Sequence, residues 1–423
     1  MELNQVLRHV LLALLTTIVS GAPAAFAQPP ASTGQALLAD PAVTRALDAV
    51  RRNEAAILDE QIRFCEIEAP PFKEARRAEA LKATFESLGL TNVRIDTAGN
   101  VLGERPGTAA SPHLVFSAHL DTVFPEGTDV RASREGRVIR GPGISDDCRG
   151  LAVLIGVIRA LNEAGIRTPG SITFVGTVGE EGLGDLRGVK HLFQDELKGR
   201  VDRFVSVDGA GLGITHTAVG SLRYRFTFKG PGGHSYGAFG LANPIHALGR
   251  AVAAIAEVRV PADPKTTFNV GRIGGGTSVN SIPFEGWMEV DMRSADKAAL
   301  SALHEAVLEA VDRAVASENR RWGTPGTISV DKQVVGDRPG GQVPAAAPIV
   351  EAAVSVTRAL GLEVSLDEGS TDSNIPISLG IPAVTIDGGG SSRGAHSLDE
   401  EFDTTDSWQG TARALLLALA LAR

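Results

Sequence analysis

Two adjacent carboxylates, Glu180 and Glu181, come just after an apolar run, Ile172–Val178, that predicts a buried strand. Burying an acidic pair at the end of a strand is unfavourable unless a positive charge lies beside it. A divalent metal ion would supply that charge, because it would bind one carboxylate and leave the other free as a proton acceptor. The pair therefore predicts a metal site that carries its own base.

Other chemically active residues occupy equivalent places along the chain. Strands alternate with helices on both sides of the acidic pair, which argues for a largely parallel sheet. In such sheets ligands gather at the carboxyl ends of the strands. His119, Glu180 and Asp208 each lie at or just past the end of a predicted strand. We therefore expect these three side chains to share one site.

Three further segments would add to this site, although each has an ordinary explanation when taken alone. On a continuing strand His119 and Asp121 share a face, so the Asp121 carboxylate would accept the second N–H of the imidazole. Asp146 and Asp147 follow a Gly-Pro-Gly turn, where a metal ligand and a helix N-cap fit equally well. His396, taken alone, would more often be a structural histidine. Together, two histidines and several carboxylates can hold two divalent ions, and this mixture suits zinc, cobalt or manganese.

The residue pattern changes at Gly220 and changes back near Asp337. Between them the pattern predicts strand, helix, two strands, helix and strand, the βαββαβ order of a ferredoxin-like antiparallel sheet with two helices. We therefore expect an α/β chain. Its catalytic domain, a mostly parallel sheet with helices on both faces, would comprise residues 28–219 and 336–423, interrupted by an inserted α+β domain at 220–335.

The composition argues against a nucleic-acid partner, and the N-terminus predicts the cellular location. The 423 residues carry a net charge of −9 with no basic run, which argues against nucleic acid. Residues 1–27 have the pattern of a signal peptide, with an apolar run at Val10–Val19 and a small-x-small cleavage site at 25–27. We expect an exported protein, periplasmic or secreted, without stable membrane insertion; a permanent N-terminal anchor is the alternative. Whether Cys65 and Cys148 pair stays open.

In combination, these segments resemble the five-part signature of the M20 metallopeptidase family: His119-x-Asp121, Gly143-Ile-Ser-Asp146-Asp147, Glu180-Glu181, Asp208 and His396. The family includes peptidase T-like tripeptide aminopeptidases, dipeptidases, glutamate carboxypeptidases and N-acyl amino acid deacylases. The order and spacing match over nearly all of the chain after residue 27, and the inserted unit resembles the family's lid or dimerisation domain.

The resemblance implies a dinuclear metal-dependent hydrolase and a role for each matched residue. The implied metal ligands are Asp146, bridging two divalent ions, His119 and Asp208 on one side, and Glu181 and His396 on the other. Zinc is the first expectation for the ions, with cobalt or manganese as alternatives. Glu180 would be the general base, and Asp121 would orient His119.

The inserted domain would contribute to the same reaction. The segment around His234 resembles the family's lid histidine, which stabilises the oxyanion and often does so across a dimer interface. Asn280 and Arg293 resemble its substrate-binding residues, and an arginine fork suits a substrate carboxylate. The resemblance also implies a homodimer that forms through the inserted domain.

The branch of the family is indicated less directly. An aspartate at position 208 looks more like the aminopeptidases and dipeptidases, so we expect hydrolysis of short peptides. An N-acyl amino acid deacylase or a glutamate carboxypeptidase-like enzyme is the alternative on the same scaffold. The usual lysine and glycine after the aspartate pair are Cys148 and Arg149 here, which leaves the surroundings of Asp146 undecided.

Two interpretations from other functional classes remain, a serine hydrolase and a binding protein. Gly233-His-Ser235-Tyr-Gly237 matches the nucleophile elbow of a serine hydrolase, and Asp372 and His396 follow in the chain order of its triad. That reading leaves the other histidine and the carboxylates without a role. A non-catalytic binding protein on the M20 scaffold is the second reading, although the base and every ligand are present.

Overall fold

The computed structural model of the chain describes residues 33–323 and 327–423. The predicted signal peptide lies outside these residues. Within the described part of the chain, no helix combines the length and apolar character needed to cross a membrane. These described residues form one compact unit.

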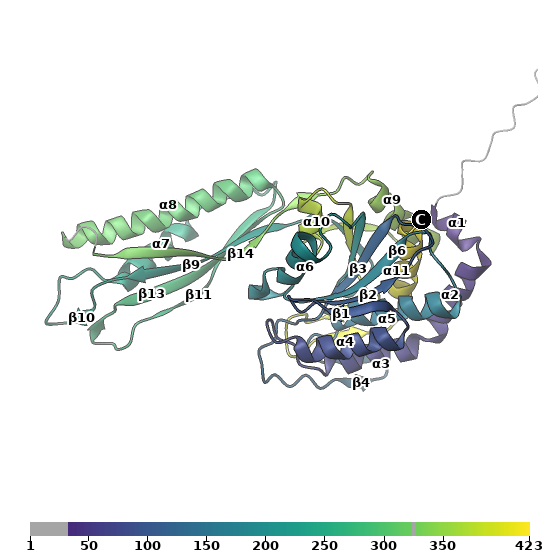
Figure 1. The fold of residues 1–423 in the computed structure, drawn as a ribbon. Coiled ribbons are helices and arrows are strands. Elements are labelled where there is room, and N and C mark those ends of the chain that lie inside the picture. Colours follow the sequence, from purple (N-terminus) through teal and green to yellow (C-terminus); the bar gives the residue numbers. More distant parts are fainter. Residues whose placement is uncertain (1–32, 324–326) are drawn as a thin grey trace, which may run out of the picture. The chain divides into compact units, whose positions relative to one another are not determined.

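The main sheet has nine strands, and its centre is parallel (Figure 1). The central strand β3 (His113–His119) lies between β6 (Ser171–Thr177) and β7 (Arg203–Val207), and all three run parallel. Strand β17 (Ala383–Ile386) extends the parallel centre beside β7. The prediction of a mostly parallel sheet is therefore confirmed at the centre, where the strands that carry or precede His119, Glu180 and Asp208 lie.

The outer strands of this sheet are mostly antiparallel. Their bounds are β1 (Thr91–Ile95), β2 (Val101–Arg105), β8 (Gly213–Ala218) and β15 (Gly341–Gln342), with β16 (Ser365–Gly369) parallel to β8. A second, four-stranded sheet in the order β18-β19-β5-β4 combines β4 (Ser133–Glu135), β5 (Val138–Arg140), β18 (Ser391–Arg393) and β19 (Glu401–Asp403). Pairing of β19 with β5 brings the loop after β18, which carries His396, beside the loop after β5, which carries Asp146.

Helices cover the main sheet on both faces, as predicted. Helix α4 (Ala75–Ser87) packs closely because β6 has a glycine beneath it: a Cβ on Gly176 would lie 2.4 Å from Leu81. Helices α5 (Cys148–Glu163) and α11 (Trp408–Leu421) both pack against β3. The remaining α-helices of this part are α1 (Thr33–Leu38), α2 (Pro41–Arg52), α3 (Glu54–Cys65), α6 (Arg187–His191), α9 (Pro348–Ala359) and α10 (Asn374–Ser378).

The inserted part has the predicted βαββαβ order. Its elements are β9 (Gly220–Lys229), α7 (Pro244–Ala256), β11 (Thr266–Gly275), β13 (Glu285–Ser294), α8 (Lys297–Trp322) and β14 (Ser329–Arg338). The strands pair antiparallel in the order β11-β13-β9-β14, as in a ferredoxin-like sheet. Phe226, Met288 and Val307 belong to a separate apolar core beneath the two helices. A short pair, β10 (Gly233–His234) with β12 (Ser281–Ile282), lies in the loops. The predicted domain boundary at residue 335 falls inside β14, which ends at Arg338. The position of that boundary therefore stays a prediction.

Candidate metal centre

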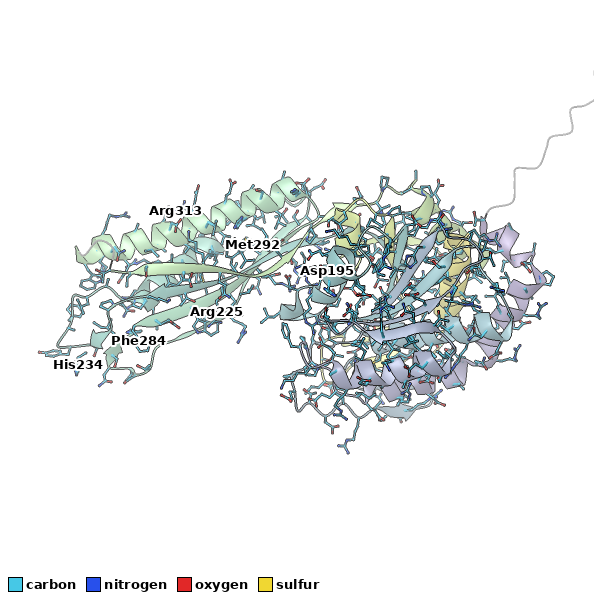
Figure 2. All side chains as sticks on the ribbon, in the orientation of Figure 1. Asp195, Arg225, His234, Phe284, Met292 and Arg313 are labelled. Carbon is cyan, nitrogen blue, oxygen red and sulfur yellow. The ribbon has the colours of Figure 1, made fainter. Side chains whose placement is uncertain are left out.

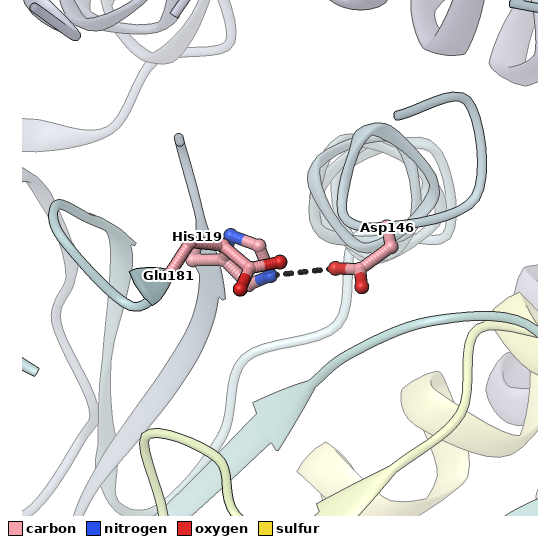
Figure 3. A group of neighbouring side chains, drawn as sticks. All are labelled: His119, Asp146 and Glu181. Carbon is pink, nitrogen blue, oxygen red and sulfur yellow. Dashed lines mark hydrogen bonds and ion pairs between the residues drawn. The ribbon is translucent and has the colours of Figure 1, made fainter. Parts of the chain in front are cut away.

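Asp146 lies between two histidines. Its Oδ1 is 2.9 Å from Nε2 of His119, the contact drawn in Figure 3, and its Oδ2 is 3.1 Å from Nε2 of His396. Each carboxylate oxygen thus faces a different imidazole. A carboxylate that bridges two metal ions needs this arrangement.

Each histidine has a further carboxylate beside it. Oδ1 of Asp208 is 3.8 Å from Nε2 of His119, and Oε1 of Glu181 is 3.2 Å from Nε2 of His396. His119, Asp146 and Glu181 bring one ligand atom each within 4.8 Å of one another. The structure therefore gathers all five predicted ligands and distributes them on the two sides of Asp146.

The donor set of this cluster fits divalent metal ions. Imidazole nitrogens and carboxylate oxygens are ligands that zinc, cobalt and manganese accept. Burial raises the pKa of Glu180 well above its usual range, although the charge of Arg338 acts in the opposite direction. Burial also raises the pKa of Glu181. Positive ions among these carboxylates would stabilise their ionised forms, so the electrostatics agree with the ligand types.

Asp146 and Asp147 divide the two roles predicted for the pair. Asp147 accepts hydrogen bonds from the backbone N–H of His119 and of Gly150, each at 2.9 Å, so it caps α5 and ties that helix to β3. Its carboxylate also lies within 4.8 Å of His119 and Asp208 ligand atoms. Because its oxygens already accept backbone N–H groups, the geometry favours Asp146 as the ligand.

Asp121 supports the centre differently from the expectation. Nδ1 of His119 bonds the backbone oxygen of Asp121 at 2.9 Å, whereas the nearest Asp121 carboxylate oxygen is 3.7 Å from Nδ1. A carbonyl only accepts, so Nδ1 carries the proton and Nε2 is left as the ligand atom. The Asp121 carboxylate instead accepts the backbone N–H groups of Glu180 and Glu181, at 3.0 and 2.8 Å. It therefore holds the turn that presents both glutamates.

Glu400 is a supporting residue that sequence reasoning does not predict. Glu400 is fully buried and accepts the backbone N–H groups of Gly143 and Ser145 at 3.0 and 2.9 Å. It thereby fixes the loop that carries Asp146. Its only signal in the sequence is an acidic run after His396, which equally describes a solvated loop.

Comparison with known proteins decides the family. Residues 115–420 match the model of peptidase family M20/M25/M40. The chain belongs to this family.

Relatives of this M20 chain share most of its length. The Bacillus subtilis (strain 168) protein YqjE, whose name records no activity, is 28% identical over 348 residues, covering 79% of this chain and 90% of the relative. A succinyl-diaminopimelate desuccinylase of Corynebacterium glutamicum is 24% identical over 357 residues, covering 80% and 89%. A tripeptidase structure from Staphylococcus aureus superimposes with a TM-score of 0.72 at 23% identity, covering 88% of this chain and 99% of that one, which shows a common fold. Membership makes the chain a hydrolase and confirms the predicted resemblance.

The three predicted residues of the inserted domain do not lie together in this M20 chain. Arg293, at the end of β13 that pairs with the start of β9, lines the pocket beside the predicted metal ligands, called the metal-facing pocket below. His234 and Asn280 lie beyond the other end of these strands, where Asn280 accepts a backbone bond from Ser235 (Figure 2 labels His234). Strand β9 has ten residues, so roughly 30 Å of strand separates its two ends.

The metal-facing pocket is small and strongly charged. It has a volume of about 280 Å³ and contains Asp146, Glu180, Glu181, Asp208 and His396 in its lining. Arg223, Arg293 and Arg338 also line it. A larger cavity of about 530 Å³ near α9 is lined by none of the predicted site residues. The polar pocket therefore brings four of the predicted metal ligands, the predicted base and three arginines together.

The serine-hydrolase reading is wrong for this chain. His396 contacts Asp146 and Glu181, and Asp372 accepts a hydrogen bond from Thr177. Ser235 follows a two-residue strand and precedes α7 by several residues, so no strand-to-helix elbow forms there.

Of the two residues that depart from the family pattern, Cys148 and Arg149, the structure gives Arg149 a clear structural role. Arg149 is fully buried, and its guanidinium donates to the carbonyl oxygens of Gly388 at 2.8 Å and Ser407 at 2.6 Å. It therefore ties the start of α5 to the segment before α11, and the metal ligands are not among its hydrogen-bond partners. Cys65 and Cys148 are both buried free thiols.

Replacing Arg149 with methionine is expected to lower the free energy of unfolding by about 2–5 kcal/mol, because two buried carbonyl oxygens lose their donor. Urea denaturation of the metal-free proteins measures this. Arg131→Met is the matched control: that arginine is 84% exposed and, among the described residues, pairs with Asp129 alone, so its loss should leave the urea midpoint nearly unchanged. Equal urea midpoints for the two variants would contradict the structural role of Arg149.

Proposed function

We propose that the protein is a dinuclear metal-dependent peptidase that hydrolyses amide bonds of short peptides, of the aminopeptidase or dipeptidase type. The observation that carries this proposal is the placement of Asp146 between His119 and His396, with Glu180 next to a ligand. The resident ions would be zinc, with cobalt or manganese as alternatives.

The mechanism assigns one role to each part of the site. Asp146, His119, Asp208, Glu181 and His396 would hold two ions, which polarise the scissile carbonyl and acidify the attacking water when bound. Glu180 would accept a proton from that water and pass it to the leaving amine. Asp121 would keep His119 and both glutamates in place through the backbone bonds described above.

The inserted domain would bind the substrate. Arg293 keeps its Nε on Asp291 at 2.7 Å, and its terminal nitrogens make no hydrogen bond to the described residues. Because Arg293 lines the metal-facing pocket, this fork is available for a substrate carboxylate. Asn280 and His234 lie at the opposite end of the strands, so we propose that they act in the site of a second copy, in a homodimer.

A second activity on the same scaffold is favoured by the charge of the pocket. Three arginines lie beside the ligands, and the terminal nitrogens of Arg293 would suit the carboxylate of an acidic product, as in an N-acyl amino acid deacylase or a glutamate carboxypeptidase-like enzyme. The aspartate at position 208 supports the peptidase instead. Both activities would use the same base and the same ligands.

Hydrolysis of a peptide panel tests the proposal. The metal-loaded protein is given short peptides with free, acylated or carboxyl-blocked termini, before and after chelation. Cleavage that needs a free amino end and is lost with the metal supports the peptidase. Cleavage of only the acylated forms moves the protein to the deacylases, and activity indifferent to metal removal refutes the assignment.

Replacing His234 with alanine is expected to lower kcat by about 10²-fold while leaving the metal content unchanged, because an oxyanion donor is lost. Steady-state kinetics and elemental analysis measure both quantities. His246→Ala is the matched control, since that histidine is exposed on α7 and pairs with Glu318.

Mixing tests whether His234 acts across subunits. Equal amounts of His234→Ala and Glu180→Gln chains, each almost inactive, should regain about a quarter of the wild-type rate in a dimer, because half of the dimers would hold one intact site. An unchanged kcat in His234→Ala would remove the oxyanion role. A mixture without recovery would remove the cross-subunit arrangement.

Export is part of the proposal, supported by the signal-peptide pattern of residues 1–27. N-terminal sequencing of the protein recovered after secretion should start at Gln28. An intact N-terminus in a membrane fraction would favour the anchor instead.

A further inference from the structure

Arg338, the last residue of β14, reaches from the inserted domain to the predicted base. Its side chain is 4% exposed, and its Nη1 lies 3.0 Å from Oε1 of Glu180. Its Nη2 donates to the backbone oxygen of the same glutamate. One guanidinium therefore holds both the side chain and the backbone of Glu180.

The two contacts of Arg338 with Glu180, called the clamp below, leave one carboxylate oxygen of Glu180 free to accept a proton. Oε1 is taken by Arg338, whereas Oε2 has no hydrogen-bond partner among the described residues. Glu180 also lines the pocket that contains the metal ligands. The geometry thus separates an anchored oxygen from an accepting oxygen on one carboxylate.

The arginine is itself held in place by its neighbours. The backbone N–H of Asp337 donates to Asp185 at 2.9 Å, and the backbone oxygen of Asp337 accepts from Lys190 at 2.8 Å. Nη1 of Arg338 also lies 3.3 Å from Oγ of Ser370. The end of β14 is therefore pinned to the segment that follows Glu181, so the clamp does not depend on a freely rotating side chain.

A counter-charge is needed at this position. Glu180 is 5% exposed and adjoins Glu181, and a carboxylate among like charges would otherwise turn away from them. A planar fork satisfies two acceptors at once, whereas the ammonium of lysine is a point charge that fixes no plane. The residue type at 338 is therefore the one that fixes direction as well as charge.

We propose that Arg338 is a positioning residue for hydrolysis, which fixes the Glu180 carboxylate so that Oε2 faces the reacting atoms. This inference rests on the proposed role of Glu180 as general base. The competing role is that Arg338 binds a substrate carboxylate directly, as proposed for Arg293 in the same pocket.

The test compares Arg338→Met and Arg338→Lys with the wild type on the best peptide of the panel. Arg338→Met is expected to lower kcat about 10- to 100-fold, with KM changed less than about threefold and the metal content intact. Arg338→Lys should recover part of kcat. Arg272→Met, an exposed arginine of β11 that pairs with Glu289, is the control for changes in the inserted sheet.

A double-mutant cycle isolates the effect on the base. In the Glu180→Gln background, Arg338→Met should cause no further fall in kcat, because the group it positions is already disabled. An equal fall in both backgrounds would overturn the inference, and so would a large rise in KM with unchanged kcat. If circular dichroism shows that Arg338→Met does not fold, the same double-mutant cycle is measured with Arg338→Lys in its place.

The outcomes also distinguish this inference from the proposed function. Near wild-type activity of Glu180→Gln would refute the base itself, and the inference with it. A strongly impaired Glu180→Gln beside a fully active Arg338→Met would refute the inference alone and leave the proposed function standing.

Discussion

Replacing Glu180 with glutamine is expected to lower kcat by about 10²–10⁴-fold without loss of metal, because the amide cannot accept the proton from water. Glutamine keeps the size of the side chain and an oxygen for Arg338, so the clamp at Oε1 can persist. Steady-state kinetics gives kcat, and elemental analysis of the dialysed protein gives the metal content.

The neighbouring glutamate provides the matched control. Glu181→Gln removes a predicted ligand beside His396, so it should lose metal as well as activity. If Glu180→Gln kept the wild-type rate, the general base would have to be another group. If both variants lost metal equally, Glu180 would be a ligand and the division of roles between the two residues would be wrong.

Asp146→Asn is expected to remove both metal ions at once and to abolish activity. Its two oxygens face different histidines, and a neutral amide cannot offer an anionic oxygen to two cations. Elemental analysis should show about two ions per wild-type chain and almost none in this variant. Chelation should lower the melting temperature of the wild type but not that of Asp146→Asn, because only the wild type gains stability from bound ions.

Asp208→Asn is the control that distinguishes a ligand of one metal ion from a ligand that bridges both. Among the described residues, Asp208 forms an ion pair with His119, at 3.8 Å from Nε2, and none with His396, so its loss should weaken one ion and spare the other. Retention of both ions by Asp146→Asn would refute the bridge. The same substitution at Asp147 should lower stability more than metal content, since that carboxylate accepts hydrogen bonds from two backbone N–H groups.

Much of the fold and the ligand set could be predicted because both follow from local patterns. Apolar runs mark β3, β6 and β7, and the carboxyl ends of parallel strands meet at one edge whatever the loops do. That rule predicts that His119, Glu180 and Asp208 share one site, and the structure brings them together. The βαββαβ order of the inserted part is equally local, since alternation and helical spacing repeat within each element.

Tertiary structure alone decided which hydrogen-bond partner each polar atom of the site takes. Asp146 and Asp147 are identical in type, and only the packing of α5 against β3 makes one the N-cap and leaves the other facing the histidines. His119 bonds the carbonyl of Asp121 because that oxygen lies nearer than the carboxylate once the chain turns.

The contact between Arg338 and Glu180 is the clearest case of this kind. The two residues are 158 positions apart, and no periodicity or spacing links them. Residue types and strand ends determined which groups reach the site. Which oxygen each group offers depends on hydrogen bonds between distant segments, and such bonds are settled only when those segments pack together.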